Sequence, residues 1–229
     1  MKKEMDVTII LDRSGSMQSI RDDTIGGFNA FVDEQKTGDT PTKITLVQFD
    51  DEYQVDYAGV LASDVKPLDR ESYVPRGSTA LLDAVGRTIN SIGARLQQLP
   101  HEERPEKVCV VIQTDGHENT SKEFSAQQIR TMVKHQEEKY SWNFIFLGAD
   151  LDAVTVGVNM LGLRSVNSAN YSKGNVAATL GAVSRGLTRY KASASSKATD
   201  ILQRGSNESI EGSVFWEKND KGTKATSNS

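Results

Sequence analysis

The stretch Val-Thr-Ile-Ile-Leu-Asp-Arg-Ser-Gly-Ser, residues 7–16, decides the fold of this chain. Its first five residues are a short apolar, mainly β-branched run, which predicts a strand buried on both faces of a parallel sheet. The run ends abruptly at Asp12, Ser14 and Ser16, where an intervening glycine allows a tight turn. Carboxylate and hydroxyl groups are hard oxygen donors, which Mg²⁺ prefers. Because ligands of open α/β sheets bind where strands end, this turn is a candidate metal-binding turn.

Regular alternation of apolar runs and helical patterns extends over most of the chain. Residues 108–113 and 142–147 predict two more buried strands, and residues 44–49 and 53–57 predict an antiparallel hairpin. Helices are expected between residue 16 and about residue 36 and at about residues 80–99, 125–138, 154–161 and 173–193, with a last short strand at 164–167. This order predicts an α/β fold: a Rossmann-like, doubly wound, mainly parallel sheet with one antiparallel edge strand and helices on both faces.

The composition of the C-terminal part differs from that of the rest. Residues 1–193 are expected to form one domain, whereas residues 194–229 are rich in Ser, Lys, Thr, Asn and Gly and are expected to form a polar tail. Residues 209–216 are too apolar for a free tail. We expect this segment to dock on the chain's own surface, with binding to a partner as the alternative.

Composition and charge exclude several classes of function. The chain has 229 residues, of which 37% are hydrophobic and 25% charged, as in soluble globular proteins. Its net charge of -4 and the absence of a basic run argue against nucleic-acid binding. No stretch approaches the ~20 apolar residues of a membrane span. The single cysteine, Cys109, lies in an apolar run, and without a signal peptide or cysteine pairs we expect a cytoplasmic protein.

Two more oxygen-bearing side chains are expected at the same edge of the sheet. Thr79 stands just before a predicted helix, and Asp115 directly follows the strand at residues 108–113. Together with the first turn they offer two carboxylates and three hydroxyls. Because Mg²⁺ in proteins takes one or two carboxylates and keeps several waters, such a set leaves a position for an outside ligand.

These motifs resemble those of von Willebrand factor A (vWA) domains. Residues 12–16, Asp-Arg-Ser-Gly-Ser, match the D-x-S-x-S signature of that family. Residues 77–79 are similar to its second loop, which supplies a threonine, and residues 114–116 to its third, which supplies an aspartate. The resemblance covers about residues 6–170, with the three motifs in the family's order and spacing. It implies a Rossmann-like domain, and we expect an intracellular bacterial or phage member.

The resemblance also implies a function. Members of the family carry a metal-ion-dependent adhesion site and bind a partner protein whose Glu or Asp completes the metal shell. The chain is therefore expected to be a non-enzymatic, Mg²⁺-dependent interaction module, with Mn²⁺ or Ca²⁺ as alternative ions. The implied metal ligands are Asp12, Ser14, Ser16, Thr79 and Asp115.

Two alternative functions remain open at this stage. A metal-dependent hydrolase would use His117 or Glu118 as a general base, although a solvated loop at the rim explains both residues more simply. A client-recruiting subunit of an ATP-driven assembly would need a motor elsewhere, because the chain has no P-loop motif. We expect Arg13 to face solvent or the partner, and Asp50 and Asp51 to solvate a tight turn.

Overall fold

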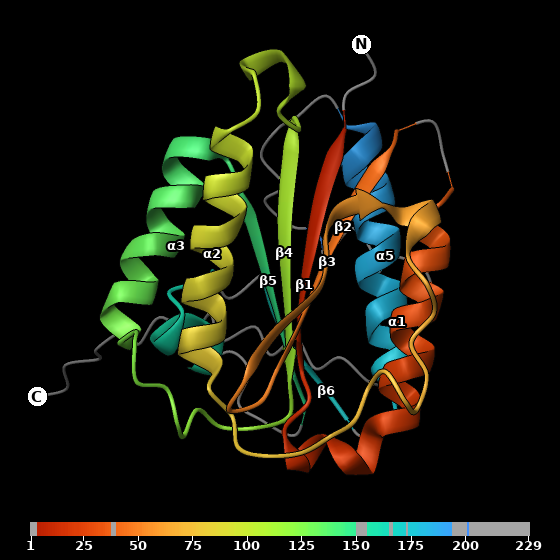
Figure 1. Cartoon of the computed structure of the whole chain (residues 1–229), viewed down its shortest axis with the longest axis vertical. Coiled ribbons are helices and arrows are strands. Elements are labelled where there is room, and N and C mark those ends of the chain that lie inside the picture. The colour runs from red at the N-terminus through yellow and green to blue at the C-terminus, as the bar shows by residue number, and fades with distance from the viewer. Residues whose placement is uncertain are drawn as a thin grey trace, which may run out of the picture.

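The structure is a computed structural model that describes residues 4–37, 40–149, 155–164, 167–172, 174–193 and 201. Its centre is one six-stranded sheet with the order β3-β2-β1-β4-β5-β6 (Figure 1). The strands are β1 (Met5–Asp12), β2 (Thr42–Phe49), β3 (Tyr53–Leu61), β4 (Lys107–Thr114), β5 (Asn143–Ala149) and β6 (Ser168–Tyr171). Neighbouring strands are parallel except β2 and β3, so the predicted sheet with one antiparallel edge strand is confirmed. The last strand of the described residues lies at Ser168–Tyr171, directly after the predicted position at 164–167, of which residues 165 and 166 lie outside the described residues.

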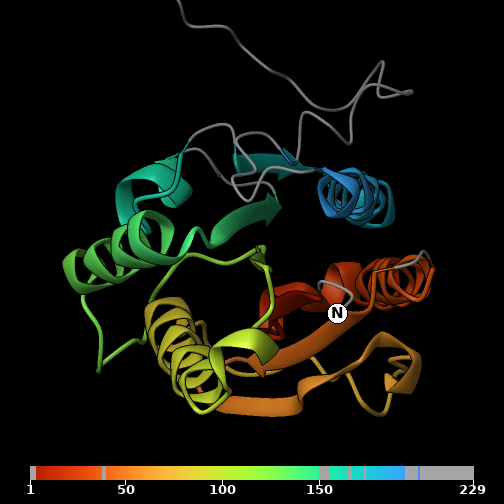
Figure 2. The ribbon, with the colours of Figure 1, turned by 90° about the horizontal axis from the view of Figure 1, so that it is seen from above.

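Helices cover both faces of the sheet, as predicted (Figure 2). One face carries α1 and α5, which pack against each other, and the opposite face carries α2 and α3. The α-helices are α1 (Arg21–Gln35), α2 (Leu81–Gln97), α3 (Ala126–Tyr140) and α5 (Val176–Ala192). The described residues also form the 3₁₀ turns η1 (Gly15–Ile20), η2 (Ala62–Asp64) and η3 (His101–Glu103) and a π-helical turn, η4 (Val156–Met160).

The apolar run of β1 is explained by burial on both sides. Ile9 and Leu11 belong to the core between the sheet and α1 and α5, whereas Ile10 belongs to the core against α2 and α3. Gly27 of α1 lies so close to α5 that a Cβ atom there would stand 3.0 Å from a Leu180 side-chain atom. Glycine has a low helix propensity, so Gly27 weakens α1 locally. At this position its lack of a side chain lets α1 and α5 pack tightly.

Cys109 is fully buried in β4, and burial raises the pKa of its thiol well above the ordinary value. Thiolates, and not protonated thiols, are the nucleophiles and metal ligands among cysteines. Cys109 is therefore a buried core side chain with little thiolate character.

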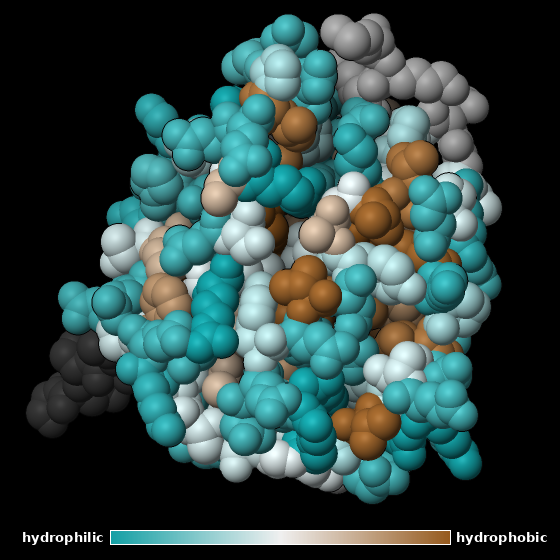
Figure 3. Space-filling view, viewed as in Figure 1, coloured by the Kyte–Doolittle hydropathy of each residue, from teal (hydrophilic) through white to brown (hydrophobic). Residues whose placement is uncertain are grey.

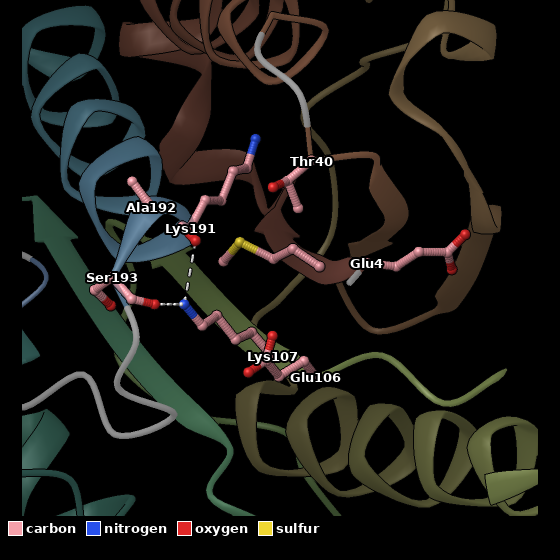
Figure 4. Close-up of a pocket in the computed structure, with 8 residues that line it drawn as sticks. Glu4, Thr40, Glu106, Lys107, Lys191, Ala192 and Ser193 are labelled. Carbon is pink, nitrogen blue, oxygen red and sulfur yellow. Dashed lines mark hydrogen bonds between the residues drawn. The ribbon is translucent and has the colours of Figure 1, made fainter. Parts of the chain in front are cut away.

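A buried lysine fastens the end of α5 to the sheet. The Lys107 Nζ atom donates hydrogen bonds to the backbone carbonyls of Tyr190 (2.5 Å), Lys191 (3.3 Å) and Ser193 (2.7 Å). Figure 4 shows the last two of these bonds, beside the open end of the helix. The last carbonyls of a helix have no partner within the helix, so this ammonium group satisfies them and complements the helix dipole.

The core extends past the end of α5. Ile201 has no solvent exposure, and its carbonyl and side chain lie against Gly186. Since the tail is expected to begin at residue 194, at least this later residue belongs to the packed domain. The apolar segment 209–216 lies outside the described residues.

The surface drawn in Figure 3 is mainly hydrophilic, with apolar side chains in separate groups. Among the described residues, the large apolar side chains with most exposure are Val55, Leu61, Val74 and Tyr140. None of the described helices combines the length and the apolar character that crossing a bilayer requires.

Candidate metal centre

The candidate site lies at the edge of the sheet where the parallel strands end. β1 ends at Asp12 and β4 ends at Thr114, two neighbouring strands that run in the same direction. Three segments meet at this edge, which is the lower one in Figure 1. We call them loop 1 (residues 12–16), loop 2 (residues 73–80) and loop 3 (residues 114–121).

Backbone hydrogen bonds hold loop 2 against loop 1. The Gly15 amide donates to the Gly77 carbonyl (3.1 Å), and the Arg76 amide donates to the Arg13 carbonyl (2.7 Å). Gly77 has a φ of +66°, in the left-handed region that favours glycine. Loop 2, about 60 residues away in sequence, is thus fixed to loop 1 at two points.

Two side chains complete this framework. The fully buried Tyr73 donates its hydroxyl to the Asp12 carbonyl at 2.6 Å. Asn119 of loop 3 pairs with Thr79 of loop 2 twice, by an amide to the Thr79 carbonyl (3.1 Å) and by its side-chain oxygen to the Thr79 amide (3.0 Å). Neither Tyr73 nor Asn119 belongs to a recognisable sequence motif, because only the folded chain brings them to these partners.

The side chains of loops 1 and 3 form a continuous chain of oxygen atoms. The Ser14 and Ser16 hydroxyl oxygens are 3.0 Å apart, and the Ser16 hydroxyl donates to Asp115 Oδ1 at 2.5 Å. The Asp12 Oδ1 atom accepts the Ser14 amide at 2.6 Å, which fixes the carboxylate at the start of the turn. Loops 1 and 3 therefore contact each other directly through candidate ligand atoms.

Thr79 joins the same cluster beside Gly116. A Cβ atom placed on Gly116 would lie 2.7 Å from Thr79 Oγ1, 3.4 Å from Ser16 Oγ and 3.5 Å from Asp12 Oδ2. Oxygen atoms of loops 1 and 2 thus lie around Gly116 of loop 3, and Asp115 of loop 3 joins them through the Ser16 hydroxyl. The structure brings together all five residues predicted from the sequence. No group of three or more His, Cys, Asp or Glu side chains suited to a metal occurs in the described part of the chain, so this cluster depends on its hydroxyls.

Asp12 is the most buried acid of the cluster. Burial raises the pKa of its carboxyl to about 6, against hydrogen bonds from Thr114 and Ser14 that lower it, while the charge of Asp115 raises it further. The Thr114 hydroxyl contacts Asp12 Oδ2 directly and accepts the Gly116 amide at 3.0 Å. Thr114 therefore orients the carboxylate, a role that the sequence analysis did not assign. The burial of a carboxylate beside a second acid favours a cation at this point.

The two candidate bases of a hydrolase have different surroundings. His117 is exposed at the rim. The Glu118 carboxylate accepts the amides of Leu82 (2.9 Å), Thr120 (3.0 Å) and Ser121 (2.8 Å), and the Ser121 hydroxyl (2.7 Å). Four donors occupy this carboxylate, so Glu118 fastens loop 3 to the start of α2. This role was not foreseen.

Arg13 and Asp50 form a buried ion pair, in contrast to the solvent-facing positions predicted for them. Arg13 is 6% exposed and donates from Nε to Asp50 Oδ2 at 3.0 Å, and Asp50 is fully buried. The register of β1 and β2 pairs Asp12 with Phe49, which brings the two following residues side by side. The expectations that Arg13 faces solvent or a partner and that Asp50 solvates a turn are therefore wrong. Asp51 is exposed, as expected.

Comparisons with known proteins give no match in sequence and many in structure. No protein-family model matches the chain, and no curated protein matches it in sequence. The vWF domain of the type V pili tip protein Mfa5 from Porphyromonas gingivalis matches with a TM-score of 0.59 at 11% identity, covering 83% of this chain and 97% of that one.

Two metal-containing structures are also similar. Proximal thread matrix protein 1 from the mussel byssus, solved with a zinc-occupied MIDAS motif, has a TM-score of 0.54 at 13% identity, covering 78% of this chain. Manganese-loaded TRAP protein from Plasmodium vivax has a TM-score of 0.51 at 14% identity, covering 77% of this chain and 71% of that one. This chain spans 46% of the mussel protein's length. At these identities the likeness concerns the fold, and the chain has the fold of a von Willebrand factor A domain.

Proposed function

We propose that this chain is a non-enzymatic, Mg²⁺-dependent interaction module that binds an acidic side chain of a partner protein. The convergence of the three loops at Ser16 supports the proposal most directly. The Ser16 hydroxyl donates to Asp115 of loop 3, and Thr79 of loop 2 and Asp12 lie with Ser16 around Gly116. The proposed ligands are Asp12, Ser14, Ser16, Thr79 and Asp115.

The donor set fits a hard divalent cation. It contains only oxygen atoms, two of the five groups are carboxylates, and hydroxyls supply the rest. If the hydroxyls and only one of the two carboxylates bind the cation directly, the centre keeps net positive charge and attracts a further carboxylate. Thr114 holds the buried Asp12 carboxylate in place through a hydrogen bond. Ser16 and Asp115 bond to each other at the exposed rim of the site. We expect a partner to approach from this rim.

The similar structures support a divalent cation in general. The mussel protein was solved with zinc in its MIDAS motif, and the Plasmodium protein was loaded with manganese. We propose Mg²⁺ for this chain because hydroxyl and carboxylate oxygens suit it. Mn²⁺ and Ca²⁺ are the alternative ions, and calorimetric titration with each ion compares their affinities for the site.

The surroundings of Glu118 favour binding over hydrolysis. Its carboxylate accepts four hydrogen bonds from loop 3 and α2, so it has no free position from which to take a proton from water. The client-recruiting alternative would use the same metal centre and differs only in its partner.

Calorimetric titration with MgCl₂ tests the metal centre. We expect the wild type to bind one ion and Asp12→Ala to give no measurable binding. Asp33→Ala is the matched control, because it removes the same charge from an exposed position near the far end of α1. Binding of the ion by Asp12→Ala with wild-type affinity would contradict the proposal.

The same variants test the interaction. Immobilised wild type is expected to retain a specific protein from a cell extract in Mg²⁺ and to release it in EDTA, and Asp12→Ala is expected to retain none. A protein retained equally with and without chelator would argue against a metal-mediated contact.

A further inference from the structure

Asp50, which directly follows β2, connects the segments that form the metal centre. Its Oδ2 atom accepts Arg13 Nε at 3.0 Å and Arg76 Nε at 2.8 Å, and its Oδ1 atom accepts the Glu52 amide at 2.6 Å. Its backbone carbonyl accepts the Ala80 amide at 3.0 Å. All three oxygen atoms of Asp50 are therefore used, by loop 1, by loop 2 and by the turn before β3.

Arg13 connects Asp50 to loop 1, because its side chain bonds to Asp50 and its backbone is part of the loop. Its side chain also donates to Gln54 Oε1 at 2.7 Å, and its amide donates to the Phe49 carbonyl at 2.7 Å. Arg13 stands between Asp12 and Ser14, and Ser14 is extended, with a φ of -61° and a ψ of 165°. In extended backbone, alternate side chains point to opposite sides. Holding Arg13 on one side therefore directs Asp12 and Ser14 to the other, where the candidate ligands gather.

Without Asp50 the guanidinium of Arg13 would lack a close acidic partner. The next acid, Glu52, is 68% exposed, and its carboxylate lies 3.8 Å from Arg13 NH2. Removing one member of a buried ion pair leaves an uncompensated charge, which costs far more than the pair contributes. Arg13 would then have to turn towards water and would move loop 1 with it.

We propose that Asp50 is a positioning residue for the metal centre: through Arg13 and Arg76 it sets the geometry of loops 1 and 2 and thereby the affinity for the cation. Asp50 is not itself a ligand, since its carboxylate oxygens are occupied by guanidinium and amide donors. This inference rests on the proposed function, because it concerns the same site.

The opposite end of β1 offers a matched control. Asp6 is also fully buried and accepts Arg95 NH1 at 2.8 Å and Arg95 NH2 at 3.0 Å. Asp6→Asn and Asp50→Asn therefore each remove one fully buried carboxylate that pairs with arginine, on or beside the same strand. Only Asp50 is connected to loops 1 and 2.

The experiment compares Mg²⁺ affinity by calorimetry with the melting temperature in EDTA for the wild type and both variants. We expect both variants to melt at lower temperature, Asp50→Asn to bind Mg²⁺ at least about tenfold more weakly, and Asp6→Asn to bind it as the wild type does. Unchanged affinity in Asp50→Asn, or an equal loss in both variants, would overturn the inference. Absence of Mg²⁺ binding by the wild type would instead overturn the proposed function.

A milder variant covers the case in which Asp50→Asn does not fold. Arg76 is half-exposed, and Arg76→Gln removes one of the two guanidinium groups that Asp50 holds without leaving a buried charge unpaired. We expect this variant to fold and to bind Mg²⁺ about threefold more weakly, within the range of effects of residues that support metal ligands. Wild-type affinity in Arg76→Gln would count against the role of Asp50.

Discussion

Gly116 shows how a missing side chain can let the candidate ligands pack closely against a loop. It is not among the glycines with positive φ, so its backbone would accept alanine. The reason for glycine is space, because a Cβ atom there would stand 2.7 Å from Thr79 Oγ1 and close to Ser16 and Asp12. Real Cβ atoms do not approach an oxygen so closely without a shift of the neighbour.

We predict that Gly116→Ala lowers Mg²⁺ affinity at least tenfold although it removes no ligand, because the methyl group would displace Thr79 from the cluster. Gly26→Ala is the control, since a Cβ atom at that position in α1 meets nothing within 4 Å. The control is expected to keep wild-type affinity and to be more stable by up to about 1 kcal/mol. Calorimetry and thermal denaturation measure both, and equal affinities in the two variants would contradict the prediction.

The convergence of the five candidate ligands could be predicted from the sequence because each follows a strand or precedes a helix. The pairing of Arg13 with Asp50 could not. Arginine is mostly exposed, and the partner depends on the register of β1 with β2, which no local pattern shows. The hydrogen bond from Tyr73 to the Asp12 carbonyl could not be predicted either, because the two residues are 61 positions apart in the sequence.

Among the elements, long apolar runs were located well and short polar ones were not. β1, β4 and β5 lie within two residues of their predicted positions because burial on both faces requires continuous apolar sequence. β6 reads Ser-Ala-Asn-Tyr, which has no apolar run, and its pairing with β5 comes from the tertiary fold. A helix is predicted at about residues 154–161, and the structure has the π-helical turn η4 at Val156–Met160. The spacing of apolar residues does not distinguish a π-helical turn from a short α-helix.

Lys107 provides a prediction for α5. Lys107→Met keeps the length of the side chain and removes three hydrogen bonds to the end of the helix. We expect the protein to lose about 1–3 kcal/mol of stability and the last turn of α5 to exchange its amide hydrogens faster. Lys43→Met, which removes a partly exposed pair with Glu4, is expected to leave that exchange unchanged. Hydrogen-exchange mass spectrometry checks both, and unaltered exchange of α5 in Lys107→Met would contradict the anchoring role.

At the scale of the whole molecule, the proposed ion adds to the stability of the fold. A ligand that binds only the folded state stabilises it by about 2.7 kcal/mol at a concentration 100 times its Kd. For a chain of 229 residues this corresponds to a rise in Tm of roughly 5–10 °C. We therefore expect Mg²⁺ to raise the Tm of the wild type and to leave that of Asp12→Ala unchanged. A Tm equal in Mg²⁺ and in EDTA would be inconsistent with a resident cation.

Ile201 decides where this protein can be shortened. Its side chain is enclosed against Gly186, eight positions beyond the last described residue of the α5 segment, Ser193. An expression clone that stops at the end of that helix would lack this buried isoleucine. The apolar surface of α5 around Gly186 would then be exposed to water, which favours aggregation. Clones intended for crystallisation or for binding assays should therefore keep the chain at least through Ile201.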